Sequence, residues 1–254
     1  MEVHAHTHTA DPDSHRGRKK WTHYFWEFLM LFLAVFCGFL AENQREHYIE
    51  HQREMQFINS FINDLEADTV KLDEIIGNRT IREARLDSLT VLLNNDSALF
   101  FTKDIYFLAV TLPRITLFQF SPSDGTMLQL KNSGGLRLIR KRAATDSIIK
   151  YDAVIKSLLR LDDQEQEIIN IQREIAPKIF NGIELSKFSD ADNLPVRLDY
   201  GPPLTPGYKS SLNEFNYRLV SIKNVNKGYR REAKKLLKQA TNLLNTLKKE
   251  YHLK

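Results

Sequence analysis

Residues 24–41, YFWEFLMLFLAVFCGFLA, contain the longest apolar run of this chain, and residues 28–41 within them are apolar without interruption. As an α-helix the quoted stretch is about 27 Å long, close to the ~30 Å hydrocarbon core of a bilayer. No later part of the sequence is as long and as apolar. We therefore predict a single-pass membrane protein whose transmembrane helix covers residues 21–42.

The residues around this run favour a permanent anchor over a cleaved targeting peptide. A secretory signal has a short basic start and small residues before its cleavage site. Here the preceding segment is long, and Phe39 and Leu40 precede Ala41, so the small-x-small pattern fails at Phe39. Cys37, the one cysteine of the chain, follows the bulky Phe36, so we interpret it as a thiol within the membrane helix. A single cysteine excludes an intramolecular disulfide.

Flanking charges predict the orientation of the anchor. Four basic residues lie at positions 16–20, whereas Arg45 and Arg53 follow the apolar run. Because Lys and Arg gather on the cytoplasmic side, we expect a cytoplasmic N-terminus in a bacterial inner membrane and a periplasmic C-terminal domain. The opposite orientation, with the domain in the cytoplasm, remains an alternative.

The membrane segment also carries a pattern of small residues. Ala34 and Gly38 form a small-xxx-small pair, and Ala41 lies one turn later. Small residues let two membrane helices approach closely. We therefore expect the lipid bilayer as one partner, and a second copy of the chain or another membrane protein as the other.

Three later segments show the spacing of amphipathic helices, near the heptad repeat of a coiled coil in the first. The first runs from Met55 to Leu93, with the acidic residues Asp64, Glu66, Asp68 and Asp73 off its apolar stripe. The second runs from about Leu136 to Pro177, and its acidic middle, residues 162–167, is expected to be solvated. The third begins near Leu212.

Turn-forming residues separate these helices. Residues 94–96 close the first helix, a short buried helix ends near Pro113, and another ends at Gly134 and Gly135. The Pro- and Gly-rich residues 194–208 are expected to cross between helices without regular helix, although strands remain possible there.

The predicted fold is all-α, with a single N-terminal transmembrane helix that continues into a stalk and an antiparallel helical bundle. The predicted parts are a disordered, His-containing basic tail (1–20), the transmembrane helix (21–42), the stalk (43–54) and the bundle domain (55–254) with its crossing at 194–208.

The C-terminal segment is strongly basic. Residues 216–254 carry eleven Lys and Arg against Glu232 and Glu250, whereas the whole chain has a net charge of +4. One interpretation is a basic surface for anionic lipid, formed by Arg230, Arg231, Lys234, Lys235 and Lys238. The alternative is that this helix packs beside the acidic first helix, with its excess charge solvated. We expect no nucleic acid as a partner.

The distribution of histidines argues against most catalytic chemistry. Seven of the eight histidines precede residue 52, so Cys/His and Ser/His mechanisms lack partners in the bundle. Asp162 and Asp163 could form a carboxylate pair, although adjacent acids on a helix usually face water. We predict no catalytic residue and no cofactor.

Two histidine patterns are candidates for a metal site. His47 and His51 match the H-x-x-E-H pattern of inverted zinc proteases, but they lie on the predicted stalk. His4, His6 and His8 lie on the polar tail, where they could chelate a metal loosely. We favour incidental histidines in both cases.

Two stretches, HYFWEFLMLFLAVFCGFLAENQRE (23–46) and LKNSGGLRLIRKR (130–142), resemble a group of bacterial single-pass membrane proteins with an N-terminal anchor and a helical domain of unknown function. The resemblance implies an architecture and no activity. Our hypothesis is a non-enzymatic, membrane-anchored helical domain for protein interaction or envelope sensing. The alternatives are a metal- or carboxylate-dependent hydrolase and a peripheral binder of anionic lipid through the basic C-terminal helix.

Overall fold

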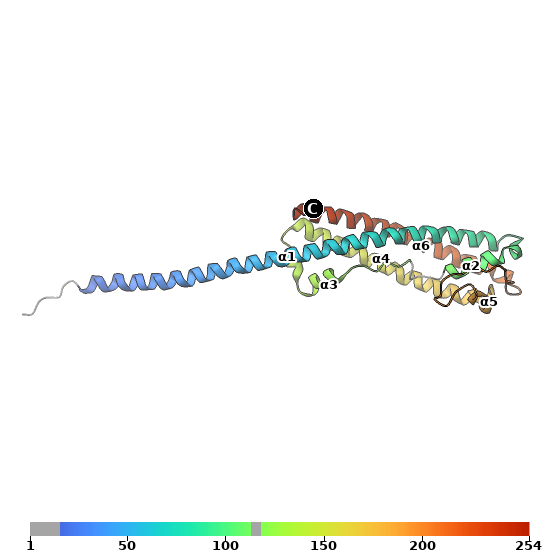
Figure 1. The fold of residues 1–254 in the computed structure, drawn as a ribbon, viewed down its shortest axis with the longest axis horizontal. Helices are drawn as coiled ribbons and strands as arrows, with labels where there is room; N and C mark the ends of the chain where they lie inside the picture. Colours follow the sequence, from blue (N-terminus) through green and yellow to red (C-terminus); the bar gives the residue numbers. More distant parts are fainter. Residues whose placement is uncertain (1–15, 113–117, 254) are drawn as a thin grey trace, which may run out of the picture. The chain divides into compact units, whose positions relative to one another are not determined.

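The structure is a computed structural model that describes residues 16–112 and 118–253, and helices dominate it (Figure 1). Within the described residues there is no β-strand, and an isolated antiparallel bridge joins Ser189 to Pro195. The predicted all-α class is confirmed.

The elements follow the expected order, with three long helices and several short ones. They are α1 (Arg16–Leu93), the 3-10 helix η1 (Ala98–Phe100), α2 (Thr102–Thr111), α3 (Gly125–Asn132), η3 (Gly135–Leu138), α4 (Arg142–Ile175), η4 (Ala176–Lys178), α5 (Gly182–Ser186) and α6 (Lys209–Glu250). The chain divides into two compact units, residues 1–55 and 56–254.

The first unit contains the apolar part of α1. This helix alone, among the described residues, holds a segment long and apolar enough to cross a membrane. Its large side chains are exposed, and the rings of Phe28, Phe32 and Phe36 stack along one side with centroid separations of 6.3 and 6.0 Å. Because α1 begins at Arg16, residues 16–20 of the predicted disordered tail are helical, which corrects that boundary.

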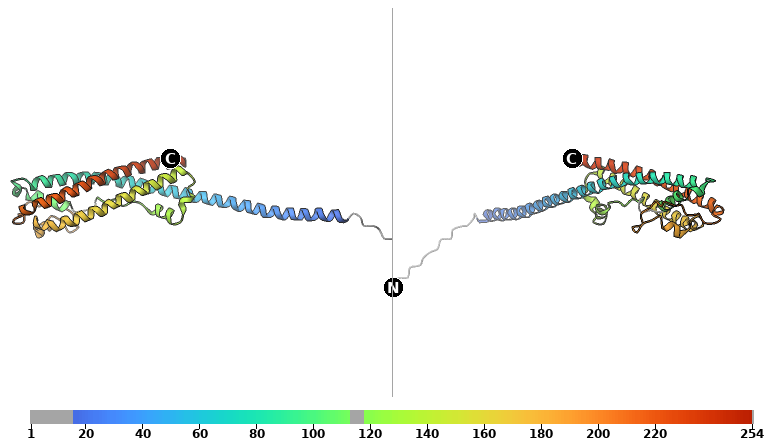
Figure 2. Two further views of the ribbon diagram at one scale, coloured as in Figure 1. Left: turned by 180° about the vertical axis from the view of Figure 1, so that it is seen from behind. Right: turned by 45° about the vertical axis from the view of Figure 1, so that its right-hand side comes forward.

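In the second unit, α1 from residue 56 onward, α4 and α6 lie side by side (Figures 1 and 2). The hydrogen bond between Lys248 and Glu66 and that between Asn216 and Asn94 show that α6 runs antiparallel to α1. By contrast, α4 runs parallel to α1, since Tyr151 meets Asp68 and the later Glu165 meets the later Arg79. The described residues between α2 and α4, 112 and 118–141, belong to the returning connection that precedes α4.

Glycine determines where α4 can start. Gly134 has a left-handed backbone, with φ of 66°, which ends α3 as the sequence predicted. The chain then forms the 3-10 helix η3, and α4 begins at Arg142 and not near Leu136 as expected. Leu136 still packs against the core. Its apolar spacing therefore reflects burial, although the residue lies before α4 begins.

Side chains of α1 hold the connection that leads into α3. Asp68 accepts a hydrogen bond from the Ser123 backbone N–H at 2.8 Å, and Asp64 accepts one from Thr126 at 3.3 Å. Asp68 also accepts a hydrogen bond from the Tyr151 hydroxyl at 2.8 Å. Carboxylates near a helix N-terminus stabilise its unpaired N–H groups. Asp68 is therefore buried within the bundle and does not lie on its solvated side.

The Pro- and Gly-rich crossing packs against α2 without regular helix. The Tyr106 hydroxyl donates to the Pro203 carbonyl at 3.0 Å and accepts from the Asn181 N–H at 2.9 Å. The Tyr106 ring also contacts Phe180 and Phe188, with centroids 5.3 and 5.5 Å away. These contacts close one end of the bundle.

Candidate functional site

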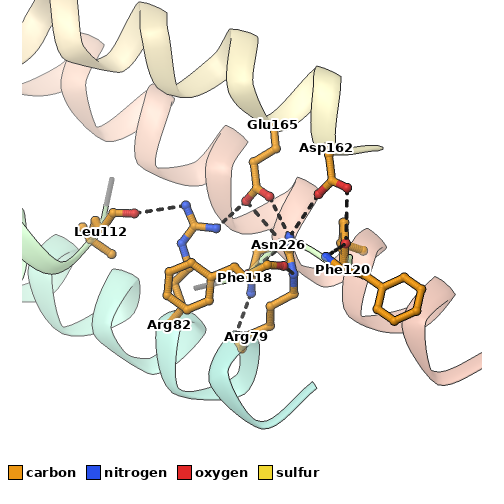
Figure 3. Close-up of polar contacts among 9 residues, drawn as sticks. Arg79, Arg82, Leu112, Phe118, Phe120, Asp162, Glu165 and Asn226 are labelled. Carbon is orange, nitrogen blue, oxygen red and sulfur yellow. Dashed lines mark hydrogen bonds and ion pairs between the residues drawn. The ribbon is translucent and has the colours of Figure 1, made fainter. Parts of the chain in front are cut away.

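A layer of buried polar residues interrupts the apolar interior of the bundle. One apolar cluster includes Ile75 on α1 and Leu158 on α4, and a second cluster resumes at Leu86 and Ile169. Between the two clusters each long helix contributes polar side chains, which we call the polar layer (Figure 3). Its members are Arg79 and Arg82 on α1, Asp162 and Glu165 on α4, and Asn226 and Tyr229 on α6.

Glu165 is the central anion of this layer. Its Oε2 accepts a hydrogen bond from Arg79 Nη2 at 2.8 Å, and its Oε1 accepts from Arg79 Nη1 at 3.4 Å and from Arg82 Nη1. All three side chains are fully buried. One carboxylate therefore neutralises part of the charge of two guanidinium groups that water does not reach.

The guanidinium groups also bind the backbone of the connection after α2. Arg79 Nε donates to the Phe118 carbonyl at 2.8 Å, and Arg82 Nη2 donates to the Leu112 carbonyl at 3.1 Å. Asn226 adds a contact from α6, since its Nδ2 donates to the Arg79 carbonyl at 2.9 Å. The layer thus joins all three long helices to the returning connection (Figure 3).

Tyr229 lies between Arg79 and Asp162. The guanidinium carbon of Arg79 stands 3.3 Å from the centroid of the Tyr229 ring, which is a close cation–π contact. The Tyr229 hydroxyl accepts the Phe120 N–H at 2.9 Å and donates to Asp162 Oδ2 at 3.4 Å. A single phenol therefore connects the returning chain to α4.

Burial changes the proton affinity of several of these groups. Removal from water raises the pKa of Asp162 to about 7, although the positive charge of Arg79, 4.0 Å away, opposes the shift. Burial lowers the pKa of Arg82, and the negative charge of Glu165 opposes this. Burial and then the nearby Asp162 raise the pKa of Tyr229. The raised pKa places the protonation of Asp162 near neutral pH.

Asp162 also borders an open groove on the surface. The groove has a volume of about 480 Å³ and is lined by Gln119, Phe120, Ser121, Pro122, Leu159, Asp162 and Asp163. Asp162 is only 8% exposed, whereas Asp163 points to solvent. The two carboxylates therefore border the groove in different environments: Asp162 is buried and contacts Tyr229 and Arg79, whereas Asp163 is exposed.

The acidic middle of α4 is more buried than its sequence predicts. Residues 162–167 were expected to be solvated, but Asp162 and Glu165 are buried because they face the two arginines. A signal for these arginines was present: Arg79 and Arg82 occupy the positions that continue the apolar stripe of α1 between Leu72 and Leu86. A cation on an apolar stripe requires a buried anion, and the i, i+3 pair of acids on α4 supplies it.

The histidine candidates are not brought together with these groups. His47 and His51 lie exposed on α1, where they approach Glu50 and Glu54 at 3.9 and 3.5 Å. Among the described residues no group of three or more His, Cys, Asp or Glu is arranged to hold a metal ion. His4, His6 and His8 lie outside the described residues. Ala34, Gly38 and Ala41 are exposed along α1 in the first unit.

Part of the basic charge of α6 is paired with acids of α1. Lys227 and Arg230 contact Glu83 at 3.4 and 3.0 Å, Lys223 contacts Asp87, and Lys248 contacts Glu66 at 3.1 Å. The basic helix α6 therefore packs beside the acidic helix α1, as the second of the two interpretations of its charge predicts. Arg231, Lys234, Lys235 and Lys238 lie exposed farther along α6.

Comparison of the chain with protein-family models, curated proteins and solved structures gave no match. The arrangement of residues is therefore the basis for a functional assignment. Chemically, the polar layer can fix the register of three helices and bind a proton at Asp162.

Proposed function

We propose that this chain is a non-enzymatic, membrane-anchored helical domain that binds a partner protein in the bacterial envelope. The observation that supports it most is the extent of α1. This one helix includes a segment of membrane-spanning length and also the first helix of the folded unit, which ends at Leu93. We propose a cytoplasmic N-terminus and a periplasmic C-terminal domain, because the basic residues precede the apolar run.

The internal chemistry of the bundle supports a binding role. In the polar layer Glu165 is engaged by Arg79 and Arg82, and Asp162 by Tyr229 and Arg79. Most polar atoms of the layer are hydrogen-bonded within it, although Arg82 Nε and Asp162 Oδ1 have no hydrogen-bond partner among the described residues. Groups engaged in this way stabilise a rigid scaffold, whereas catalytic groups need access to a substrate.

An exposed apolar turn offers a surface for the partner. Leu99 and Phe100 follow the end of α1, and their exposed fractions are 66% and 86%. Because these two large apolar side chains are exposed, they contribute little burial free energy to the fold. Aromatic anchors of this kind contribute strongly to protein interfaces.

Site-specific photocrosslinking in cells tests this assignment. A photoreactive amino acid at Phe100 should give discrete adducts, and their masses will distinguish a second copy from another protein. The matched control is Val70, which is 69% exposed on α1. Equal adducts at both positions, or adducts at neither, would contradict a specific interface at the turn.

The proposed topology has its own test. Tags near residues 2 and 254 are followed by protease protection in spheroplasts. The C-terminal tag should be digested while the N-terminal tag survives. Protection of the C-terminal tag would place the bundle in the cytoplasm and overturn the envelope assignment.

Self-association of the membrane helix is a second part of the proposal. Ala34, Gly38 and Ala41 lie on the side of α1 away from the stacked Phe28, Phe32 and Phe36. A Cβ at Gly38 meets no atom within 4 Å, so Gly38→Ile fits the single helix. We expect this change to reduce crosslinked dimer, whereas Leu33→Ile should leave it unchanged. Equal dimer yields would exclude this face.

The competing proposal is a carboxylate-dependent hydrolase, which the groove beside Asp162 and Asp163 favours. Purified full-length chain that hydrolyses a substrate and loses the activity in both Asp162→Asn and Asp163→Asn, while remaining folded, would replace the binding assignment. Absence of hydrolysis across ester, phosphoester, glycoside and peptide substrates would end the hydrolase proposal.

A further inference from the structure

Six cationic side chains of α6 border one shallow depression on the surface of the bundle. We call this set the basic face: Lys227, Arg230, Arg231, Lys234, Lys235 and Lys238. The depression has a volume of about 450 Å³, and these six residues alone line it. Successive members are alternately three residues and one residue apart, which places all six on one side of the helix.

Only the edges of the basic face are neutralised. On one edge Glu83 contacts Lys227 and Arg230 at 3.4 and 3.0 Å. On the other edge Glu232 contacts Arg231 and Lys235 at 3.5 and 2.8 Å. Six cations and two carboxylates leave a local net charge of +4.

The middle of the face is unpaired. Within the described part of the chain Lys234 and Lys238 form no ion pair, and both side chains are exposed. They lie one turn apart, at i and i+4, where like charges repel each other. Such repulsion costs folding free energy and is relieved when an anion binds between the two groups.

Packing of the bundle does not require these cations. In the same stretch of α6 the interior is built by Tyr229, Ala233 and Leu236, which are fully buried. The contacts with Glu83 attach α6 to α1, but they use only two of the six cations. The other four cations do not attach α6 to α1, so they are available to solvent or to a ligand.

We propose that the basic face binds the phosphate groups of an anionic lipid surface. This inference rests on the proposed membrane anchorage, which keeps the chain in a compartment bounded by lipid phosphates. Four of the six cations are lysines, whose flexible point charges suit mobile phosphates better than fixed bidentate recognition. Each cation near an anionic membrane strengthens binding about fivefold.

Other polyanions fit the face less well. Single-stranded nucleic acid is bound with aromatic side chains on which bases stack, but the one aromatic residue between positions 227 and 238 is the buried Tyr229. An acidic protein partner would need a large apolar anchor among the cations, and Leu236 is buried while Leu237 is partly buried. A lipid headgroup layer requires neither feature.

Vesicle flotation with the full chain tests the proposal. The chain is embedded in phosphatidylcholine nanodiscs, so that its own bilayer carries no net charge. Vesicles of phosphatidylcholine with about one third phosphatidylglycerol should bind it at about 0.05 M salt and release it at about 0.5 M, because salt screens exposed charges. Vesicles of phosphatidylcholine alone should not bind.

Matched variants locate the interaction. Lys234→Gln/Lys238→Gln should weaken binding about 25-fold, whereas Lys234→Arg/Lys238→Arg, which keeps both charges, should retain it. Lys150→Gln/Arg160→Gln removes two exposed cations from α4 and should have little effect. Equal loss in the α4 control would show non-specific attraction, and tighter binding of a single-stranded oligonucleotide than of vesicles would replace the lipid assignment. Failure of this assay with a periplasmic C-terminal tag would overturn the lipid site and leave the anchored domain standing.

Discussion

Arg79 and Glu165 join α1 to α4 through a contact of 2.8 Å in which neither side chain is exposed to solvent. Without Glu165, two buried guanidinium groups would lose their shared anion in an interior that is apolar on both sides of the layer. A shift of one helix turn between α1 and α4 would move a guanidinium into an apolar cluster. The pair therefore specifies the register of two parallel helices.

Glu165→Gln should destabilise the bundle by about 3–5 kcal/mol, since it leaves two buried guanidinium groups without their shared anion. Urea unfolding followed by circular dichroism measures this change. The control is Glu167→Gln, an exposed acid two residues later, which should stay within about 0.5 kcal/mol of the parent. Similar values for the two variants would show that the buried ion pair does not stabilise the fold.

Asp162 should make the stability depend on pH. Its pKa is raised from 3.8 to about 7 in the folded chain, so between these values the folded state binds more protons than the unfolded state. Stability contributed by this group is therefore complete below about pH 4 and falls as the pH rises towards 7, by up to about 4 kcal/mol. Urea unfolding of the parent and of Asp162→Asn should diverge over this range, with the variant relatively more stable at pH 7.

Glu167→Gln is the control for the pH experiment, because this exposed acid of α4 is not one of the charges that shift the pKa of Asp162. Its difference from the parent should vary less between pH 4 and 7 than that of Asp162→Asn. A constant difference for Asp162→Asn would mean that Asp162 titrates with an ordinary pKa, held there by Arg79.

Tyr229→Phe should cost about 1–3 kcal/mol, because the buried Phe120 N–H loses its acceptor at 2.9 Å while the ring over Arg79 is kept. Hydrogen exchange at the Phe120 amide should become faster, and mass spectrometry of the corresponding peptide measures it. Tyr217→Phe, at a position that is 66% exposed, should change neither quantity. Unchanged protection in Tyr229→Phe would show that the phenol does not hold the connection.

Asp68→Ala should loosen the segment that leads into α3. The change removes the acceptor of the Ser123 N–H and of the Tyr151 hydroxyl, each 2.8 Å away, and should cost about 2–4 kcal/mol. Faster exchange should be confined to the amides near Ser123. Asp73→Ala, an exposed acid on the same helix, should leave the stability within about 0.5 kcal/mol.

Gly201→Ala should displace the crossing from α2. A Cβ at this position would lie 2.3 Å from Thr102 Oγ1 and 2.7 Å from the Lys103 backbone nitrogen, so the two segments must separate. We expect a loss of about 1–3 kcal/mol in thermal or urea unfolding. Gly182→Ala is the control, because its Cβ would meet no atom within 4 Å. Equal stability of both variants would mean that the crossing does not lie close against α2.

Periodicity was a reliable guide to the long helices. The turn residues after Leu93 ended α1 as predicted, and Pro177 follows α4 within three residues of its end at Ile175. Apolar spacing predicts which side of a helix is buried in the bundle. Arg79 and Arg82 lie on that side of α1 and are buried although they are not apolar. A glycine pair marked the break between α3 and α4, but spacing alone did not separate the 3-10 helix from α4.

Charge was harder to interpret from the sequence. The acids at 162 and 165 have the composition of a solvated surface, and their burial depends on cations that are 83 and 86 residues away from Glu165 along the chain. Such pairing is a tertiary property that local patterns do not contain. The direction of α4 relative to α1 was likewise set by the returning connection, whose short helices give no directional signal.

The position of α6 has a consequence for the order in which the chain is made. Lys248 meets Glu66 across 182 residues, and Leu247 is buried in the same cluster as Ile58 and Leu65. The apolar side of α1 is therefore covered only in part, by α4 and the segment before it, until α6 has left the ribosome. Under the proposed topology the domain crosses the membrane unfolded, and its folding on the far side is complete only when α6 (Lys209–Glu250) has followed.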